Sequence, residues 1–152
     1  MHVYRITTTR YSRDLSGTGA RLYGGRWNPK GISVVYTAES RALATVEYLV
    51  HVPLSLVPRD LSLVTLQLPD AIPWTTVALT DLPANWRDYP APSALADLGA
   101  QWASAQETLA LRVPSAVVAQ EYNVLLNPLH PDMSHVTIVQ VDPYQFDPRL
   151  LR

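Results

Sequence analysis

The sequence of 152 residues contains no cysteine and no long uninterrupted run of hydrophobic residues. The absence of cysteine excludes disulfide bonds and thiolate zinc sites, and it is typical of a protein from a reducing compartment. No stretch approaches the ~18 apolar residues needed to span a bilayer, and the first residues, MHVYRITTTRYSR, lack the apolar centre of a signal peptide. We therefore expect a cytoplasmic protein that has no membrane segment.

An excess of charge of one sign is also lacking, because the formal net charge is −1 at pH 7. Without a positive excess a protein has little general attraction to nucleic acid, so we expect no direct binding of DNA or RNA. The first 30 residues nevertheless carry six Arg or Lys side chains against a single Asp. This locally basic segment favours a small anionic ligand over a polymer, and scattered surface arginines are the structural alternative.

Several common catalytic motifs are absent. The glycines at positions 17, 19, 24 and 25 form neither a P-loop nor a dinucleotide-binding fingerprint. The four histidines lack the HExxH spacing, and no group of carboxylates indicates a metal site, so we expect neither a metal nor a bound cofactor. Ser115 lies in Val-Pro-Ser-Ala without the GxSxG elbow that presents a hydrolase nucleophile.

What is present indicates one folded domain over residues 1–152, because 47% of the residues are hydrophobic and 16% are charged. Period-two and short apolar runs predict strands at 2–7, 32–37, 61–68, 109–113, 116–118, 124–126 and 136–141. Two main helices are predicted, one between a Ser40 cap and Pro53 and one from a Ser93 cap to about Gln106. The fold class is therefore α+β, a compact domain of short mixed strands with two main helices.

Three segments carry more specific expectations. Residues 8–31 are predicted to form a long ordered loop, because they are polar and rich in glycine. The run 61–68 alternates hydrophobic and polar residues, which predicts a strand with one solvent-exposed face. Residues 69–92 contain five prolines and two tryptophans and are predicted to form an ordered excursion, and the tail after 141 is predicted to form an edge segment and a turn.

The stretch from position 17 to 47 concentrates the unusual residues of the chain: five of the six glycines, two arginines five positions apart and a single glutamate on a predicted helix. Helical spacing places Glu47 between Leu43 and Val50 on the predicted apolar face, where an unpaired charge is costly. Glu47 is therefore either half of a structural ion pair with Arg26 or part of a functional site. The residues alone leave both possibilities open.

The motif GxGARLYGGRWNPKGxxVVYTAExxxxAxxExLVH, read at positions 17–51, resembles the signature of the RES domain family, the toxins of RES–Xre toxin–antitoxin modules. The resemblance continues through LPANW, ALADLGAQW, VPSAVV, LLNPLHPD and FDPRL, at 82–86, 94–102, 113–118, 125–132 and 146–150. It therefore covers nearly the whole chain. It implies a fold related to the ADP-ribosyltransferase toxins and the consumption of NAD+, and it implies an Xre-like helix-turn-helix antitoxin as partner.

Carried over position by position, the resemblance implies active-site roles for Arg26, Tyr36, Glu47 and Ser115. It also implies substrate-binding positions, without a specified role, at Arg21, Trp27 and Asn127. Without the resemblance, the aromatic residues of this set are ordinary packing residues and Ser115 is an ordinary turn residue.

The chemistry of NAD+ cleavage suits these residue types. Breaking the nicotinamide–ribose bond creates positive charge on the ribose, which a carboxylate such as Glu47 stabilises. Arg26 offers a planar fork for the pyrophosphate, and Tyr36 offers a ring on which nicotinamide can stack. Ser115 lacks a partner base and is interpreted as a positioning residue rather than a nucleophile.

Three functions remain open at this point. The first is NAD+ degradation by hydrolysis, or by phosphorolysis with inorganic phosphate as co-substrate. The second is mono-ADP-ribosylation of a protein, a metabolic enzyme in the family's reported cases. The third is a non-catalytic nucleotide-binding or interaction module, for which a carboxylate at the scissile bond has no purpose.

Overall fold

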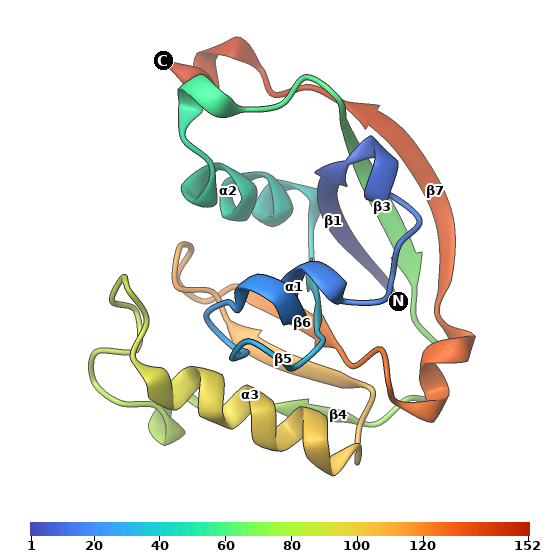
Figure 1. Cartoon of the computed structure of the whole chain (residues 1–152), viewed down its shortest axis with the longest axis vertical. Coiled ribbons are helices and arrows are strands. Elements are labelled where there is room, and N and C mark those ends of the chain that lie inside the picture. Colours follow the sequence, from blue (N-terminus) through green and yellow to red (C-terminus); the bar gives the residue numbers. More distant parts are fainter.

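The computed structural model describes residues 1–152 and contains one seven-stranded sheet with three α-helices (Figure 1). The strands are β1 (His2–Thr8), β2 (Val35–Ala38), β3 (Leu61–Gln67), β4 (Trp74–Thr76), β5 (Ala110–Pro114), β6 (Tyr122–Leu126) and β7 (Thr137–Tyr144). The helices are α1 (Thr18–Tyr23), α2 (Arg41–His51) and α3 (Ser93–Ala105). The predicted α+β class is confirmed. No helix has the length and apolar content required to cross a membrane.

The sheet has the order β4-β5-β6-β2-β1-β3-β7, and all neighbours are antiparallel except β4 and β5. Its weak point lies between β1 and β2, which pair only at Tyr4 and Ala38. By contrast, β1 pairs with β3 from His2 to Thr8. The sheet therefore consists of two halves, β4-β5-β6-β2 and β1-β3-β7, which are joined only at this pair of residues. Strands β1 and β2 diverge on moving away from it.

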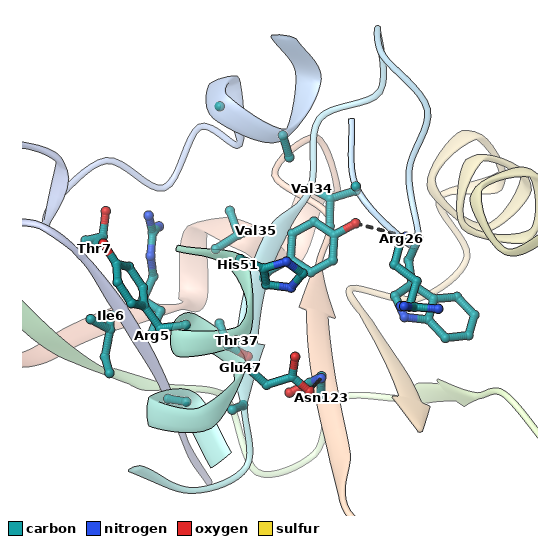
Figure 2. A pocket seen from close by; sticks show the side chains of 18 of the residues that line it. Arg5, Ile6, Thr7, Arg26, Val34, Val35, Thr37, Glu47, His51 and Asn123 are labelled. Carbon is teal, nitrogen blue, oxygen red and sulfur yellow. Dashed lines mark hydrogen bonds between the residues drawn. The ribbon is translucent and has the colours of Figure 1, made fainter. Parts of the chain in front are cut away.

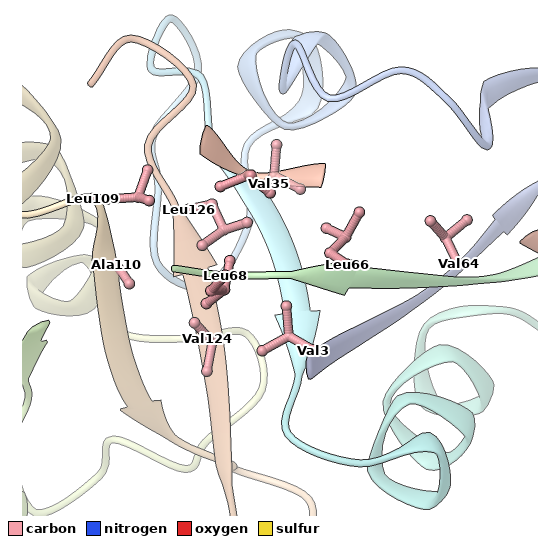
Figure 3. Packing of buried hydrophobic residues seen from close by; sticks show 10 residues of the cluster. Val3, Val35, Val64, Leu66, Leu68, Leu109, Ala110, Val124 and Leu126 are labelled. Atoms are coloured by element: carbon pink, nitrogen blue, oxygen red, sulfur yellow. The ribbon is translucent and has the colours of Figure 1, made fainter. Parts of the chain in front are cut away.

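Two main hydrophobic clusters form the core, and the larger one joins the two halves of the sheet. The larger one contains residues of both halves, including Val3 and Val64 from one and Val124 and Leu126 from the other (Figure 3). The second lies on the opposite face of β5 and β6, where α3 packs through Leu95 and Trp102. A third, smaller cluster attaches α2 to β2.

The helix between Ser40 and Pro53 is confirmed, because Ser40 Oγ accepts a 3.0 Å hydrogen bond from the backbone N–H of Leu43. The expected apolar face of this helix is wrong in detail. Leu43 is buried, whereas Val50 is 56% exposed. Glu47 therefore lies beside the buried stripe of α2 and not within it.

Other expectations require correction. Residues 8–31 are not only loop, since they include the 3-10 turn Thr9–Tyr11 and the short helix α1. The second main helix is capped by Pro92, and Ser93 is already helical. Residues 116–118 form no strand but belong to the turn after β5. The excursion 69–92 is ordered as expected, and it adds the unpredicted edge strand β4.

The strand predicted at 61–68 has no solvent-exposed face. All residues of β3 from Leu61 to Leu66 are buried, and only Gln67 is partly exposed. The face expected to be exposed carries Leu63 and Thr65, which pair with Ile6 and Tyr4 of β1. The side chains of Tyr4 and Ile6 pack against the third cluster, which includes Leu43 of α2. Helix α2 therefore covers the face of the sheet that the alternating pattern predicted to be solvent-exposed.

Candidate active site

A cleft of about 990 Å³ opens where β1 and β2 diverge. It is lined by side chains from both strands, from α2, from the α1 segment and from the start of the turn after β5. Its volume lies at the upper end of the ~300–1,000 Å³ that is usual for small-molecule sites. The single pairing between the two halves of the sheet therefore creates a space for a ligand of nucleotide size.

Glu47 points into this cleft from α2, and two neutral donors fix its carboxylate (Figure 2). Oε1 accepts hydrogen bonds from Ser115 Oγ at 2.6 Å and from Asn123 Nδ2 at 2.7 Å. No side chain of the protein donates to Oε2, and no Arg or Lys forms an ion pair with Glu47. The ion pair with Arg26 that the sequence left open is therefore not formed, and one carboxylate oxygen is oriented while the other stays available.

Ser115 is held as firmly as the carboxylate it contacts. The residue directly follows β5 and is buried. Its Oγ accepts hydrogen bonds from the backbone N–H groups of Val117, at 3.1 Å, and Val118, at 3.0 Å, while it donates to Glu47. The hydroxyl proton is thus directed at the carboxylate, which is the geometry of a group that positions Glu47.

Arg26 lines the cleft from the loop after α1 (Figure 2). Its Nη1 donates to the carbonyl oxygen of Trp86 at 2.8 Å, and no carboxylate forms an ion pair with it. Burial lowers the pKa of the guanidinium below its usual range, an effect that Glu47 and nearby acidic groups oppose. A half-buried cation with most of its donors unused favours an anionic ligand.

Tyr36 lines the cleft from β2, and its hydroxyl forms hydrogen bonds with the loop that carries Arg26. It donates to Asn28 Oδ1 at 2.6 Å and accepts from the backbone N–H of Trp27 at 3.1 Å. Asn28 in turn donates to the carbonyl oxygens of Ala20 and Ile32. Burial raises the pKa of the Tyr36 phenol, so it remains a hydrogen-bond donor.

Trp27 lines the cleft next to Arg26, although its side chain is buried. Its side chain belongs to the hydrophobic cluster under α3 and is 3% exposed. A Cβ added at Gly99 would lie 1.6 Å from the carbonyl oxygen of Trp27. Only glycine at this position lets α3 approach the backbone next to Arg26.

The structure does not bring Arg21 and Asn127 to the main cleft. Both line a separate cavity of about 330 Å³ near the end of α3. The Asn127 amide donates to the carbonyl oxygen of Ala103 at 2.9 Å and accepts from the N–H of Leu129 at 3.1 Å. Its hydrogen-bonding groups are thus used within the fold, and Arg21 lies at the surface.

The sequence reasoning missed three polar residues that the structure brings to this region. Asn123 orients Glu47, and Asn28 joins Tyr36 to the loop. Arg5 lines the cleft from β1, donates to the carbonyl oxygen of Asp14 at 2.9 Å, and has its pKa lowered by burial. For Arg5 and Asn123, the sequence signal was a polar residue within or directly before a predicted apolar strand, in YRI at 4–6 and in YNVLL at 122–126.

Comparison with known proteins identifies the family. The RES domain family matches residues 2–147. The Prs ADP-ribosylating toxin of Sphingobium sp. (strain YBL2) is 40% identical, over 98% of this chain and 96% of the toxin. Toxin Res of Yersinia enterocolitica (serotype O:8 / biotype 1B) is also 40% identical, over 99% of both chains.

Among solved structures, a chain of the M. tuberculosis MbcT–MbcA toxin–antitoxin complex shares the fold, with a TM-score of 0.76 and 21% sequence identity. The likeness covers 99% of this chain and 86% of that chain. The family match and the sequence relatives extend over nearly the full length. This chain belongs to the RES domain family of toxins.

Proposed function

We propose that this protein is the toxin of a toxin–antitoxin module and degrades NAD+ by cleaving the bond between nicotinamide and ribose. One observation carries the proposal: a carboxylate fixed through one oxygen, with its other oxygen free, lines the same nucleotide-sized cleft as a guanidinium that forms no ion pair. This arrangement provides a negative charge for a cationic transition state and a positive charge for a pyrophosphate.

In the proposed mechanism, Glu47 lies beside the ribose carbon C1′ and stabilises the oxocarbenium-like transition state. Its free Oε2 accepts a hydrogen bond from a ribose hydroxyl, while Ser115 and Asn123 keep the carboxylate in place. Arg26 binds the pyrophosphate, and the ring of Tyr36 provides a face for nicotinamide. Neutral nicotinamide leaves with the bonding electrons, so the departure requires no metal ion.

The acceptor in this proposal is water or inorganic phosphate, which gives ADP-ribose or its 1″-phosphate. A protein acceptor is the second candidate, and the name of the Sphingobium relative, a toxin that ADP-ribosylates Prs, favours it. Both candidates use the same cleavage and differ in the group that attacks C1′. A module that only binds nucleotides is the third candidate, and the oriented carboxylate argues against it.

We further propose that a helix-turn-helix antitoxin of the Xre type neutralises the toxin and that both act in the cytoplasm. The related fold comes from a toxin–antitoxin complex, which is the observation that supports a protein partner. The net charge of −1 supports the absence of direct nucleic-acid binding by the toxin itself.

Product analysis tests the proposal. The purified protein is incubated with NAD+, with and without phosphate, and nicotinamide, ADP-ribose and ADP-ribose-1″-phosphate are measured. Radiolabelled NAD+ with a cell lysate tests the protein acceptor in parallel. Release of nicotinamide with a free sugar product supports NAD+ degradation, whereas label on a protein supports the transferase. Absence of both would contradict the proposed activity and favour the binding module.

A further inference from the structure

The cleft-facing side of α2 contains more than Glu47. Ala44, Glu47, Tyr48 and His51 all line the cleft, at the i, i+3, i+4 and i+7 spacing of one helix face. His51 follows Glu47 by four residues, so their Cα atoms are separated by about 6 Å along the helix axis. Figure 2 shows both side chains, with the carboxylate of Glu47 beside Asn123.

The imidazole of His51 makes no polar contact that would stabilise the fold. No hydrogen bond or ion pair of the protein involves it, and the residue is exposed in the last turn of α2. The other titratable side chains that line the cleft are Tyr4 and Arg5 of β1, Tyr11, Asp14, Tyr23, Arg26, Tyr36, Glu47, Tyr48, Arg87 and Tyr89. Among all of these residue types, only histidine ordinarily changes its charge near neutral pH.

We propose that His51 is the general base that accepts a proton from the water molecule attacking C1′. The proposal rests on the NAD+ cleavage proposed above. As the bond between C1′ and the nicotinamide nitrogen breaks, its electron pair neutralises the pyridinium. A water oxygen forms the new bond to C1′, and one of its protons passes to the neutral imidazole.

Glu47 is less suited to this task because its carboxylate is already committed. Oε1 accepts two short hydrogen bonds, and the proposed mechanism places Oε2 against the ribose. A carboxylate that becomes protonated would also lose the negative charge that stabilises the transition state. Glu47 therefore stabilises the transition state by its negative charge, and His51 accepts the proton of the attacking water.

This division has a consequence for the choice of acceptor. Phosphate dianion attacks through an oxygen that carries no proton, so it needs no base, whereas water does. The competing interpretation is that His51 only provides a favourable cation at the C-terminus of α2. That interpretation predicts an effect on stability and none on the reaction.

The test compares nicotinamide release by the wild-type protein and by His51→Asn, without phosphate and with added phosphate. Without phosphate, we expect nicotinamide release by His51→Asn to be slower by about 100-fold. Added phosphate recovers most of the lost rate, and free imidazole partly rescues His51→Ala. His135→Asn is the matched control, because the His135 side chain is 67% exposed outside the cleft.

Each other outcome has a separate meaning. Equal rates for the wild type and His51→Asn without phosphate would overturn the role of His51 and leave NAD+ cleavage intact. A wild-type protein that releases nicotinamide only with phosphate would overturn it as well. A wild-type protein that releases no nicotinamide under either condition would overturn the proposed function, and the inference with it.

Discussion

Glu47 and Ser115 are 68 positions apart in the chain, and a hydrogen bond of 2.6 Å joins the hydroxyl of one to the carboxylate of the other. The contact links helix α2 to the residue that follows β5. The pairing of Asn123 with Ala38 brings the second donor to the same oxygen. The carboxylate of α2 is therefore oriented by one donor in β6 and one donor directly after β5.

Ser115→Ala should reduce both activity and stability. The change removes the donor to Glu47 and leaves two backbone N–H groups of the turn without their acceptor. We expect the free energy of unfolding to fall by about 1–3 kcal/mol. We also expect kcat for nicotinamide release to fall more than KM changes, because the carboxylate is misplaced rather than removed.

The measurements are urea denaturation and steady-state kinetics. Ser104→Ala is the control, because Ser104 is exposed and its hydroxyl makes no hydrogen bond within the protein. Unchanged kcat in a folded Ser115→Ala protein would exclude a positioning role for this hydroxyl.

Tyr36→Phe should destabilise the protein by about 1–3 kcal/mol at pH 8, because Asn28 and the N–H of Trp27 lose their partner. The difference should shrink above pH ~10, the ordinary pKa of tyrosine. Burial raises the pKa of Tyr36 in the folded state, so the unfolded chain loses this proton first. Rising pH therefore favours unfolding of the wild type through this group.

Urea midpoints at pH 8, 10 and 11 measure this effect. Tyr23→Phe is the control, because Tyr23 is 80% exposed and its hydroxyl has no partner in the protein. A gap between the wild type and Tyr36→Phe that stays constant over this range would contradict the raised pKa of Tyr36.

Thr65→Val should stabilise the protein. The Oγ1 atom of Thr65 is buried in β3 and has no hydrogen-bond partner, so replacing it with a methyl group removes a desolvation cost of about 1 kcal/mol. Thr37→Val is the matched contrast, because Thr37 Oγ1 donates to the carbonyl oxygen of Val124 at 2.6 Å. Thermal denaturation should show opposite shifts, and a loss of stability in both variants would contradict the account of Thr65.

Gly99→Ala should destabilise the protein by about 1–3 kcal/mol or more and also reduce activity. The added Cβ cannot occupy a position 1.6 Å from the Trp27 carbonyl oxygen, so α3 or the loop that carries Arg26 must move. Gly19→Ala in α1 provides the comparison, because no atom lies within 4 Å of its added Cβ. Calorimetry and NAD+ binding should separate the variants, and equal behaviour would show that the α3 contact does not position Arg26.

The local features of the chain could be predicted from the sequence. Helical spacing and the Ser40 cap locate α2 and with it Glu47, because these signals depend on neighbouring residues only. The features that depend on distant pairing could not be predicted. The burial of Thr65 depends on α2 covering that face of β3, and the contact between Asn123 and Glu47 depends on the register between β2 and β6.

Proximity in the sequence was also an unreliable guide to proximity in space. Arg21 and Arg26 are five residues apart, but α1 and the turn after it direct them to different cavities. Arg5 lies outside the glycine-rich stretch and nevertheless enters the main cleft, because β1 forms one of its walls. A motif thus identifies a set of residues, and the fold decides which of them meet.

The most direct test of the account is the activity of Glu47→Gln. The amide keeps the size of the side chain and a hydrogen-bonding oxygen but removes the negative charge. We expect a folded protein that binds NAD+ in calorimetry with an affinity close to that of the wild type, and that releases nicotinamide at least ~100-fold more slowly. Wild-type rates of nicotinamide release by Glu47→Gln would contradict the central claim that this carboxylate stabilises the cleavage of NAD+.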